Sequence, residues 1–568
     1  MKQRVAHDYV LYDPASALVA PPAIDILIVT YNAAECIERC IESVMRSSYP
    51  AEYVRIIILD NNSVDNSVSV VSQCKRTYTN LIVIENGENI GFGEGMNRAF
   101  EHATAPYIFV LNPDTELDPE CLTRLVSRAE QSEEHGFVAW EARQQPYEHP
   151  KAYDPVTLEA DWMSGACFLM KSDRFKELDG FDRRIFLYCE DIDLSLRIRM
   201  NGWKIMYVPD AVVIHDTYEE PGITKPAQFY HSLVSHALLR YKYTGIKNFL
   251  FFHLHFLKAL FRPLSLPNVR RRMIYLYVEN IPNFYHSFIW KLKNRKNIKK
   301  TDLNFNVVDI GIKRYGAFHR IEHSNTTPLV SIVIRTRERP DFLRDALQSV
   351  RNQTYQNVEV IVAEDRSDSS RDVINEFSDL DITHIMVGEP GGRCVAGNLA
   401  FARAKGKYIN LLDDDDLFYA DHLEVLVNAL ENDGIVKAAY TLGFEVTTKI
   451  IRESPLTFVE YMYKTLHRRR HDIDVLLRRN YIPIHCMMFD RSLFLEEGGF
   501  DEKIDLLEDW DLWIRYSHYT DFLYIDKTTC IFRSPYGIKK IKGRIDALWE
   551  TYDIVREKHV DQTPVREA

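Results

Sequence analysis

The 568-residue chain lacks several features that mark other classes of protein. Its nine cysteines include no C-x-x-C pair, and the closest two, Cys36 and Cys40, fall on the apolar face of a predicted helix. We therefore expect buried, reduced thiols and no disulfide framework. There is no apolar run of about 18 residues, the length that a spanning helix needs, and the N-terminus lacks the apolar core of a signal peptide. These absences predict a cytoplasmic protein.

The chain also lacks a positive excess, since its formal net charge is −12. Nucleic-acid-binding proteins usually carry extra cations to neutralise phosphates, so we expect no nucleic-acid partner. What the chain does contain is 46% hydrophobic residues, enough to build several cores, and its length predicts two to four domains.

Apolar runs and amphipathic stretches alternate from residue 24 onward. Short apolar runs such as "IDILIVT", "VRIIILD" and "YIFVLN" are typical of strands in a sheet that is covered on both faces. Between the first two, "AAECIERCIESVMRS" repeats its apolar residues at helical spacing. The fold class predicted by this alternation is α/β.

The same order of segments returns from Val330, starting with "VSIVI" and "RPDFLRDALQSVRNQ". Matching residues keep nearly constant separations in the sequence: 306 for Thr30 and Thr336, 301 for Asn97 and Asn398, 301 for Asp114 and Asp415, and 318 for Asp191 and Asp509. We therefore predict two copies of one domain. The predicted organisation is an extension over 1–22, domains over 23–240 and 328–536, a helical segment over 241–327 between them, and a helical tail over 537–568.

An acidic motif follows an apolar strand in both copies. The second copy has "INLLDDDDLF", with Asp413 to Asp416, whereas the first has "VLNPDT", with Asp114 and with Asn112 in the place of Asp413. Ligands of open α/β sheets bind beyond the carboxyl ends of the strands, and Mg²⁺ needs few protein oxygens when phosphates complete its shell. The motif therefore suits a metal–diphosphate site, and a solvated acidic loop is the alternative interpretation.

A second acidic motif opens a predicted helix in each copy, "EDIDLSLR" in the first and "EDWDLWIR" in the second. Both follow a "GFD" turn and begin with Glu-Asp, which are Glu190 and Asp191 or Glu508 and Asp509. The pairs Asp193 with Arg197 and Asp511 with Arg515 stand four residues apart, and we interpret them as structural ion pairs on one helix face.

Taken together, these motifs resemble those of family-2 inverting glycosyltransferases with the GT-A fold. In the first copy the resemblance rests on "VTYN", "LDNNSVDNS", "NIGFGEGMN", "NPD", "SGACFLM" and "EDIDLSLR". In the second it rests on "IRTRERP", "AEDRSD", "GGRCVAGN", "LDDDD", "NYIPIHCMMFDRSLFLEEGGFD" and "EDWDLWIR". The two matches cover roughly 400 residues, and the first domain looks most like rhamnosyltransferases and related deoxysugar or furanose transferases.

The resemblance implies that each domain binds a nucleoside-diphosphate sugar and a divalent metal, Mn²⁺ or Mg²⁺, and passes the sugar to an acceptor hydroxyl. It makes Asp191 and Asp509 the general bases. Asp415, helped by Asp413, is the implied metal ligand of the second domain. Asp114 is that of the first, where His215 matches a histidine that often assists the metal or the diphosphate.

The same resemblance places the nucleotide at the first-strand turn and at the end of the second strand. The implied contacts with the nucleotide sugar, UDP- or dTDP-linked, are Thr30, Asn32, Asp60, Asn97 and Asn112 in the first domain and Thr336, Glu338, Glu364, Asp365, Arg393, Asn398 and Arg533 in the second. Local sequence alone leaves Asp60 and Glu364 open to a turn-forming role. Arg337-Glu338 replaces the usual Tyr-Asn, and Arg533 replaces the histidine, although a guanidinium could contact phosphate directly.

Residues 241–300 hold thirteen Lys or Arg against one acid, Glu279, together with thirteen aromatics. Such a mixture favours amphipathic helices on an anionic membrane surface, where each cation contributes about 1 kcal/mol. A helical spacer is the alternative, and nucleic-acid binding is a weaker third. Membrane contact would place the enzyme on the inner face of the plasma membrane, beside a lipid-linked acceptor.

The main hypothesis is a bifunctional enzyme that builds a bacterial surface polysaccharide such as O-antigen or capsule, using a saccharide or lipid-linked oligosaccharide acceptor. One alternative keeps only the second domain active and makes the first a carbohydrate-binding or structural module, because its acidic motif has one charge. Nucleotidyl transfer also uses Asp pairs after strands, but "EDWDLWIR" and "GGFD" speak against it.

Overall fold

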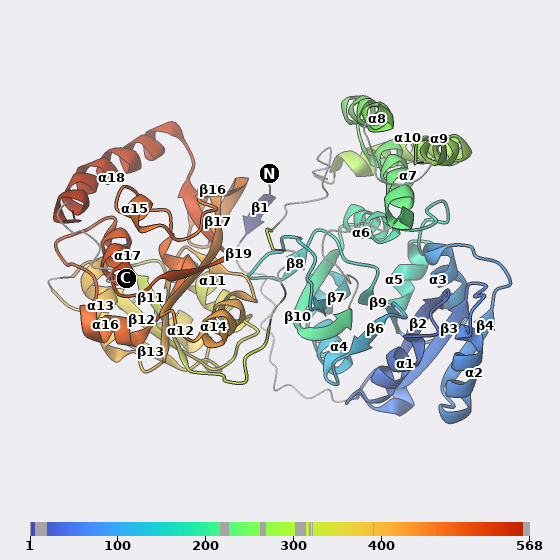
Figure 1. Ribbon diagram of the computed structural model, residues 1–568, viewed down its shortest axis with the longest axis horizontal. Helices are drawn as coiled ribbons and strands as arrows, with labels where there is room; N and C mark the ends of the chain where they lie inside the picture. The colour runs from blue at the N-terminus through green and yellow to red at the C-terminus, as the bar shows by residue number, and fades with distance from the viewer. Residues whose placement is uncertain are drawn as a thin grey trace. The chain divides into compact units, whose positions relative to one another are not determined.

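The computed structural model describes residues 2–5, 20–215, 226–261, 269–300, 314–316, 320, 322–389 and 391–559. The chain divides into two compact units (Figure 1). The first domain consists of Val10–Tyr153 and Thr157–Lys313, and the second of Met1–Tyr9, Asp154–Val156 and Arg314–Ala568. The predicted pair of α/β domains is confirmed.

The first domain is built on one mixed sheet of nine strands in the order β4-β3-β2-β5-β9-β7-β10-β6, with β8 beside β10. The strands are β2 (Ile24–Thr30), β3 (Val54–Asp60), β4 (Leu81–Glu85), β5 (Tyr107–Leu111), β6 (Thr115–Leu117), β7 (Phe137–Gln145), β8 (Glu159–Ala160), β9 (Cys167–Lys171) and β10 (Lys204–His215). Its helices before the basic segment are α1 (Ile37–Met45), η1 (Ala51–Tyr53), α2 (Ser67–Thr77), α3 (Phe92–Phe100), α4 (Cys121–Ser132), η2 (Glu133–His135), α5 (Ser172–Glu177) and α6 (Glu190–Met200). The neighbours β2, β3, β4 and β5 run parallel, so their carboxyl ends share one edge.

The second domain repeats this order as β13-β12-β11-β14-β18-β16-β19-β15, and β17 and β1 are added on the other edge of β16. Its strands are β1 (Lys2–Val5), β11 (Val330–Thr336), β12 (Val358–Asp365), β13 (Ile382–Val387), β14 (Tyr408–Asp413), β15 (Leu417–Phe418), β16 (Ala438–Glu453), β17 (Leu456–Thr465), β18 (Met487–Asp490) and β19 (Phe522–Pro535). Its helices are α11 (Pro340–Arg351), α12 (Arg371–Asn375), α13 (Arg393–Arg403), α14 (His422–Asp433), α15 (Ile473–Leu476), η3 (Ile484–Cys486), α16 (Arg491–Glu497), α17 (Glu508–Ser517) and α18 (Ile538–His559). The N-terminal strand β1 pairs antiparallel with β17, so part of the predicted extension belongs to this sheet.

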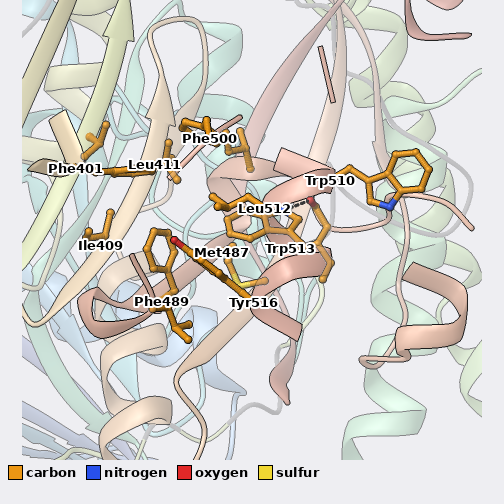
Figure 2. Packing of buried hydrophobic residues seen from close by; sticks show 14 of the residues in the cluster. Phe401, Ile409, Leu411, Met487, Phe489, Phe500, Trp510, Leu512, Trp513 and Tyr516 are labelled. Carbon is orange, nitrogen blue, oxygen red and sulfur yellow. Dashed lines mark hydrogen bonds between the residues drawn. The ribbon is translucent and has the colours of Figure 1, made fainter. Parts of the chain in front are cut away.

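Both faces of the second sheet are covered, which explains why its central strands are apolar throughout. One core cluster contains Leu343 and Leu347 of α11 with Leu426 of α14. The opposite cluster contains Trp510 and Trp513 of α17, and Figure 2 shows Trp513 lying against the strand residues Met487 and Phe489. The two indoles donate to the carbonyls of Leu476 and Ile482, which fixes the start of α17 beside the sheet.

The two predicted ion pairs four residues apart exist, and each attaches a further helix to its domain. Arg197 Nε lies 2.7 Å from Asp193 Oδ2, and Lys242 Nζ and the Tyr243 hydroxyl donate to the other oxygen of Asp193. Lys242 and Tyr243 end α7 (Pro226–Tyr243), so this carboxylate joins α7 to α6.

In the second domain Asp511 plays the same part for α18. Arg515 Nε lies 3.0 Å from Asp511 Oδ2, while Lys558 Nζ and His559 Nε2 each lie 2.8 Å from Oδ1. The helix after the sheet is thus attached in the same way in both domains. The predicted boundary at residue 240 falls inside α7, which begins at Pro226.

The basic segment is helical, with α8 (Ile246–Phe261), α9 (Val269–Glu279) and α10 (Ile281–Lys300) following α7 (Figure 1). These helices meet in an aromatic core, where the ring of Tyr241 stacks on Phe284 and the ring of Tyr277 contacts Phe256. Within the described residues, no helix is both long enough and apolar enough to cross a membrane.

Candidate active sites

The parallel strand ends of the first domain collect its candidate residues. Thr30 and Asp60 end β2 and β3 and are direct neighbours in the register of these strands. Asn112 follows β5, and its backbone N–H donates to the carbonyl of Ala166 just before β9. Its neighbour in that loop, Gly165, donates to Asp191, so the strand end and the start of α6 meet through residues 165 and 166.

The structure brings Asp114 and His215 together from distant parts of the sequence. Thr115 pairs with His215 across β6 and β10, and His215 Nε2 lies 3.4 Å from Asp114 Oδ1. His215 Nδ1 is 2.8 Å from Gln144 Oε1, which assigns the proton to Nδ1 and a lone pair to Nε2. A carboxylate and an oriented imidazole fit a divalent cation such as Mn²⁺.

Asp191 is held in the first turn of α6. Its Oδ2 accepts a hydrogen bond of 2.9 Å from Gly165 N, and its Oδ1 accepts one of 2.7 Å from Ile192 N. Cys189, just before the helix, has a φ of 69°, a left-handed turn that directs the Glu190-Asp191 pair. Burial raises the pKa of Asp191, as a general base that works near neutral pH requires.

Two buried oxygens of the first domain, Thr30 Oγ1 and Asp60 Oδ1, have no hydrogen-bond partner among the described residues. The other oxygen of Asp60 accepts from Ser63 N at 2.9 Å, so the turn-forming role also holds. Buried polar atoms are normally paired, so a nucleotide with a suitable donor fits this position. Asn32, with a φ of 54°, instead accepts from Val64 N in the turn.

Asn97 and Asn398, predicted to contact nucleotide, are occupied by the backbone. Asn97 accepts from Phe181 N at 2.8 Å and donates to the Phe181 carbonyl at 3.0 Å. Asn398 makes the same two bonds with Phe500, at the same distances. Both amides therefore hold the "GFD" turns, and their predicted contact with the nucleotide stays a prediction.

Every carboxylate of the acidic turn of the second domain, Asp413 to Asp416, contacts an arginine or a histidine side chain. Arg335 contacts Asp413, Arg339 contacts both Asp414 and Asp415, and His485 contacts Asp416. Burial, followed by Asp415, raises the pKa of Asp414 to about 7. Burial would also raise the pKa of Asp413, but the Arg335 ion pair lowers it below its ordinary value.

Arg335 joins the acidic turn to the start of α17. Its Nε and Nη2 lie 2.9 and 2.7 Å from Asp413 Oδ1, and its Nη1 lies 2.9 Å from Glu508 Oε1. All three charged groups are largely buried, and removal of one would leave the others uncompensated. Asp413 is thus an ion-pair partner of Arg335, and its predicted role beside the metal stays a prediction.

Asp415 lies between two guanidinium groups. Its Oδ2 is 3.0 Å from Arg339 Nη2, and its backbone carbonyl accepts from Arg533 Nη1 at 2.8 Å. Arg533 Nη2 also lies 3.4 Å from Asp345 Oδ2. A carboxylate paired with one guanidinium, with a second guanidinium on its backbone carbonyl, does not reproduce the carboxylate–imidazole pair of the first domain, so these residues fit a metal less well.

Asp509 repeats the geometry of Asp191. Its Oδ2 accepts from Asn480 Nδ2 at 2.9 Å, and its Oδ1 accepts from Trp510 N at 2.8 Å. Leu507, just before α17, has a φ of 60°. Burial, followed by the neighbouring Glu508, raises the pKa of Asp509 to about 7.

In the second domain, the residues predicted to contact the nucleotide at the strand ends are hydrogen-bonded to other protein groups. Thr336 donates to Asp414 at 2.8 Å. Glu364 accepts from Ser367 and Ser369 and contacts His384, so its carboxylate is already satisfied as a turn-forming group. Asp365 accepts from Gly392 N at 3.2 Å.

The two remaining candidates in the second domain lie near the surface. Glu338 is exposed and has a φ of 52°. Arg393 Nη1 lies 3.7 Å from Glu508 Oε1. An arginine there is well placed to receive an anion near the start of α17.

Sequence reasoning missed five residues that organise these sites: Gln144, Arg335, Arg339, Asn480 and His485. For one of them, Arg335, the sequence does contain an indication of its role. Arg335 interrupts the apolar run of β11, and a charge in a strand covered on both faces needs a buried partner.

Family models match the same two regions of the chain. The model described as glycosyl transferase family 2 matches residues 25–186 and 331–496, together more than half of the 568 residues. The chain belongs to glycosyl transferase family 2. A further model, glycosyltransferase like family 2, matches residues 156–228. The tandem family-2 arrangement predicted from the motifs is therefore confirmed.

The matched relatives each cover less than half of this chain. The N-acetylglucosaminyl-diphospho-decaprenol L-rhamnosyltransferase of Mycobacterium tuberculosis is 27% identical over 241 residues, which is 35% of this chain and 77% of that protein. The hyaluronan synthase of Pasteurella multocida is 29% identical over 225 residues, 39% of this chain and 22% of that protein. Among solved structures, the mannosyltransferase PcManGT of Pyrobaculum calidifontis, in complex with GDP-Man and Mn²⁺, covers 51% of this chain and 80% of its own at 16% identity and a TM-score of 0.33.

Proposed function

We propose that this glycosyltransferase is bifunctional and that each domain moves a sugar, with inversion, from a nucleoside-diphosphate donor to a hydroxyl of a saccharide acceptor. The observation that supports two active domains is the repeated geometry of Asp191 and Asp509. Each lies in the first turn of its helix with both carboxylate oxygens oriented by hydrogen bonds. Each also has a raised pKa, so it can accept the acceptor proton as the new bond forms.

The departing diphosphate needs positive charge, and we propose that the domains supply it differently. In the first domain Asp114 and His215 would hold Mn²⁺ or Mg²⁺, which supplies Lewis-acid stabilisation to the leaving group when bound. In the second domain Arg339 and Arg533 flank Asp415 and would contact phosphate oxygens directly. Asp415 stays the candidate ligand for any metal there.

For the donor of the first domain, the buried Thr30 and Asp60 oxygens without partners support recognition of a UDP- or dTDP-linked sugar. A carboxylate oxygen at that position can accept the N3–H of uracil or thymine. A deoxyhexose is the favoured sugar class, because the mycobacterial relative is named as a rhamnosyltransferase. That relative's name also supports a lipid-linked acceptor and a place in surface polysaccharide synthesis, such as O-antigen, lipopolysaccharide or capsule.

The test is transfer by the purified full chain against a panel of nucleotide sugars and saccharide acceptors, with Asp191→Asn and Asp509→Asn variants. We expect each variant to lose one linkage and keep the other, so that each is the matched control for its twin. If Asp191→Asn retains every linkage while Asp509→Asn loses all of them, the first domain is a carbohydrate-binding or structural module and the bifunctional proposal is wrong.

We further propose that the enzyme works on the inner face of a membrane through α8, α9 and α10. Large apolar side chains, 43% to 81% exposed, recur every three or four residues along these helices. They are Leu250, Leu254, Leu257 and Phe261 on α8, and Ile274, Val278, Ile281, Tyr285, Phe288 and Leu292 along α9 and α10. Water-exposed stripes of this length are typical of helices that lie in a lipid interface.

Exposed cations accompany both stripes and favour a lipid surface over a spacer role. They are Lys247, Lys258, Arg270, Arg271, Arg272, Lys293, Arg295 and Lys296, and Glu279 is the one acid between residues 241 and 300. Cations at a bilayer with anionic headgroups contribute about 1 kcal/mol each. An apolar stripe with this charge therefore suits an anionic membrane.

Vesicle sedimentation tests this placement separately from catalysis. We expect the protein to pellet with phosphatidylglycerol vesicles, and an Arg270→Gln, Arg271→Gln, Arg272→Gln triple variant to bind less, while transfer to a water-soluble acceptor is unchanged. No binding by the unaltered chain, or an oligomer that buries the stripes, would contradict membrane docking without affecting the catalytic proposal.

A further inference from the structure

A cluster of metal-binding side chains lies outside the acceptor and donor chemistry of the second domain. His485 and Cys486 belong to η3, and Cys530 belongs to β19. All three are buried, and one donor atom from each lies within 4.8 Å of the others. The Cys486 and Cys530 sulfurs are 3.2 Å apart.

The imidazole of His485 is oriented toward the thiols. Its Nδ1 lies 3.1 Å from Asp416 Oδ2, at the end of the acidic turn. Both ring nitrogens are buried, and neither has a hydrogen-bond partner with good geometry among the described residues. A carboxylate on one ring nitrogen, with the other nitrogen turned to two sulfurs, is the usual arrangement of a histidine that binds zinc.

Gly443 on β16 leaves space among these three side chains. A Cβ at this position would lie 3.1 Å from the Cys486 sulfur, 3.1 Å from His485 Nε2 and 3.5 Å from the Cys530 sulfur. The three donor atoms therefore all lie close to the side of β16 that Gly443 leaves without a side chain. No other buried cluster of His and Cys occurs within the described part of the chain.

The first domain does not have the three side chains His485, Cys486 and Cys530 at the equivalent positions. Gly443 pairs with Cys530 across β16 and β19, and the equivalent pair across β7 and β10 is Arg143 with Val212. Strand register likewise aligns Ala166 and Cys167 with His485 and Cys486. The first domain thus has one thiol here, no histidine, and a buried arginine where the second has glycine.

The chemistry of the donors favours a soft cation over Mg²⁺ or Mn²⁺. Two thiols and an imidazole are the ligand types that select zinc. On a tetrahedral zinc ion, with Zn–S bonds of about 2.3 Å, two sulfurs stand about 3.8 Å apart. The observed pair needs to open by about half an ångström to reach that geometry.

We propose that His485, Cys486 and Cys530 bind one zinc ion, with a solvent molecule or a backbone carbonyl as the fourth ligand. The ion joins η3 to β19 directly behind the acidic turn, because His485 contacts Asp416. Binding releases the two thiol protons and stabilises the folded second domain. The proposal goes beyond sugar transfer and does not depend on the identity of either donor.

The test is metal analysis of the full-length protein, purified with its affinity tag removed and with no donor or Mn²⁺ added. We expect about one zinc per chain in the unaltered protein and in an Asp114→Ala variant, and a tenfold lower content in Cys486→Ser and Cys530→Ser. Cys394→Ser is the matched control, because this buried thiol of the same domain bonds to the Ile504 carbonyl and lies outside the cluster.

A second measurement does not rely on the folding of the variants. Cobalt added to the chelator-treated, unaltered chain should give the intense thiolate charge-transfer absorption of a Cys-ligated site. Absence of both zinc and this absorption overturns the proposal. So does equal zinc in Cys486→Ser and the unaltered protein, or a Cys486–Cys530 disulfide in freshly purified, metal-free protein. None of these results would bear on whether Asp191 and Asp509 act as bases.

Discussion

The two glycosyltransferase domains share a sheet order but treat charge at the strand ends in different ways. The first keeps a single acidic side chain, Asp114, beside His215, and the part of the chain that the structure describes gives buried Thr30 Oγ1 and Asp60 Oδ1 no hydrogen-bond partner. The second has four consecutive carboxylates, of which Arg335 contacts one, Arg339 contacts two and His485 contacts the last. A longer acidic run is therefore no measure of metal binding, because part of it balances arginines that the other domain lacks.

The largest expected difference between the domains is the effect on stability of removing Arg335, an arginine that the first domain lacks. Arg335→Ala should lower the free energy of unfolding of the second domain by about 3–5 kcal/mol, because Asp413 would lose its ion pair and the buried Glu508 would keep only Arg393, 3.7 Å away. Urea denaturation of the full chain, followed by a probe of each domain, measures the effect. Arg337→Ala is the control, since this neighbour is 57% exposed and should change stability by less than about 0.5 kcal/mol.

A double substitution tests whether Arg335 and Asp413 stabilise the second domain as a pair. Arg335→Val with Asp413→Asn installs the residues that the first domain has at these positions, Val29 and Asn112. We expect it to be less destabilised than Arg335→Ala, because one unpaired charge is removed together with the arginine. Equal losses for the single and double variants would show that Asp413 and Arg335 are not coupled.

Metal activation should differ between the domains. With the second domain silenced by Asp509→Asn, Gln144→Ala should weaken Mn²⁺ activation of the remaining transfer by about 10–100-fold, because His215 loses the group that orients it. The measurement is the Mn²⁺ concentration at half-maximal rate. Arg533→Ala in an Asp191→Asn background is the counterpart, and it should raise the donor KM while leaving that Mn²⁺ concentration unchanged. If Arg533→Ala changed the Mn²⁺ concentration and Gln144→Ala did not, the proposal that a metal serves the first domain and arginines serve the second would be wrong.

The pH profile of the second domain offers a smaller effect. Asp509 has a pKa of about 7 and must be deprotonated to act as a base. With the first domain silenced by Asp191→Asn, kcat/KM should therefore fall about tenfold per unit below pH 7 and level off above it. A rate that is flat between pH 5 and 8 would argue against Asp509 as the base.

The smallest effect is expected for Asp413 as a metal ligand. Because its carboxylate is bound to Arg335, Asp413→Asn should change the Mn²⁺ concentration for half-maximal transfer by less than about threefold. Asp415→Ala is the comparison in the same turn. A larger shift for Asp413→Asn than for Asp415→Ala would restore the metal role that the sequence predicted.

Much of the fold was readable from the sequence because strands covered on both faces are uninterrupted apolar runs. The runs "IDILIVT" and "VRIIILD" are the observed β2 and β3. The repeat spacing located the second domain, and Asp114 and His215, chosen by resemblance, lie 3.4 Å apart. Each of these signals is local in the sequence or is carried by a motif.

The remaining details depend on contacts between distant segments. Nothing near Asn97 or Asn398 in the sequence reveals that a "GFD" turn will occupy the amide. Nor does the run of four aspartates show that three arginines and a histidine converge on it from β11, α11, β19 and η3. Pairings of this kind are set by strand register and helix placement, which motif spacing does not encode.

The pairing of β1 with β17 has a consequence for synthesis on the ribosome. Lys2 lies opposite Glu460 in that register, so residues 2–5 are made well before the strand that completes their hydrogen bonds. At about 5–20 residues per second, the delay is roughly 20–90 seconds, during which the whole first domain is made. Until then residues 2–5 have no strand to pair with, and an unpaired strand edge invites pairing with other chains. The order of translation therefore leaves the sheet of the second domain incomplete for longer than that of the first.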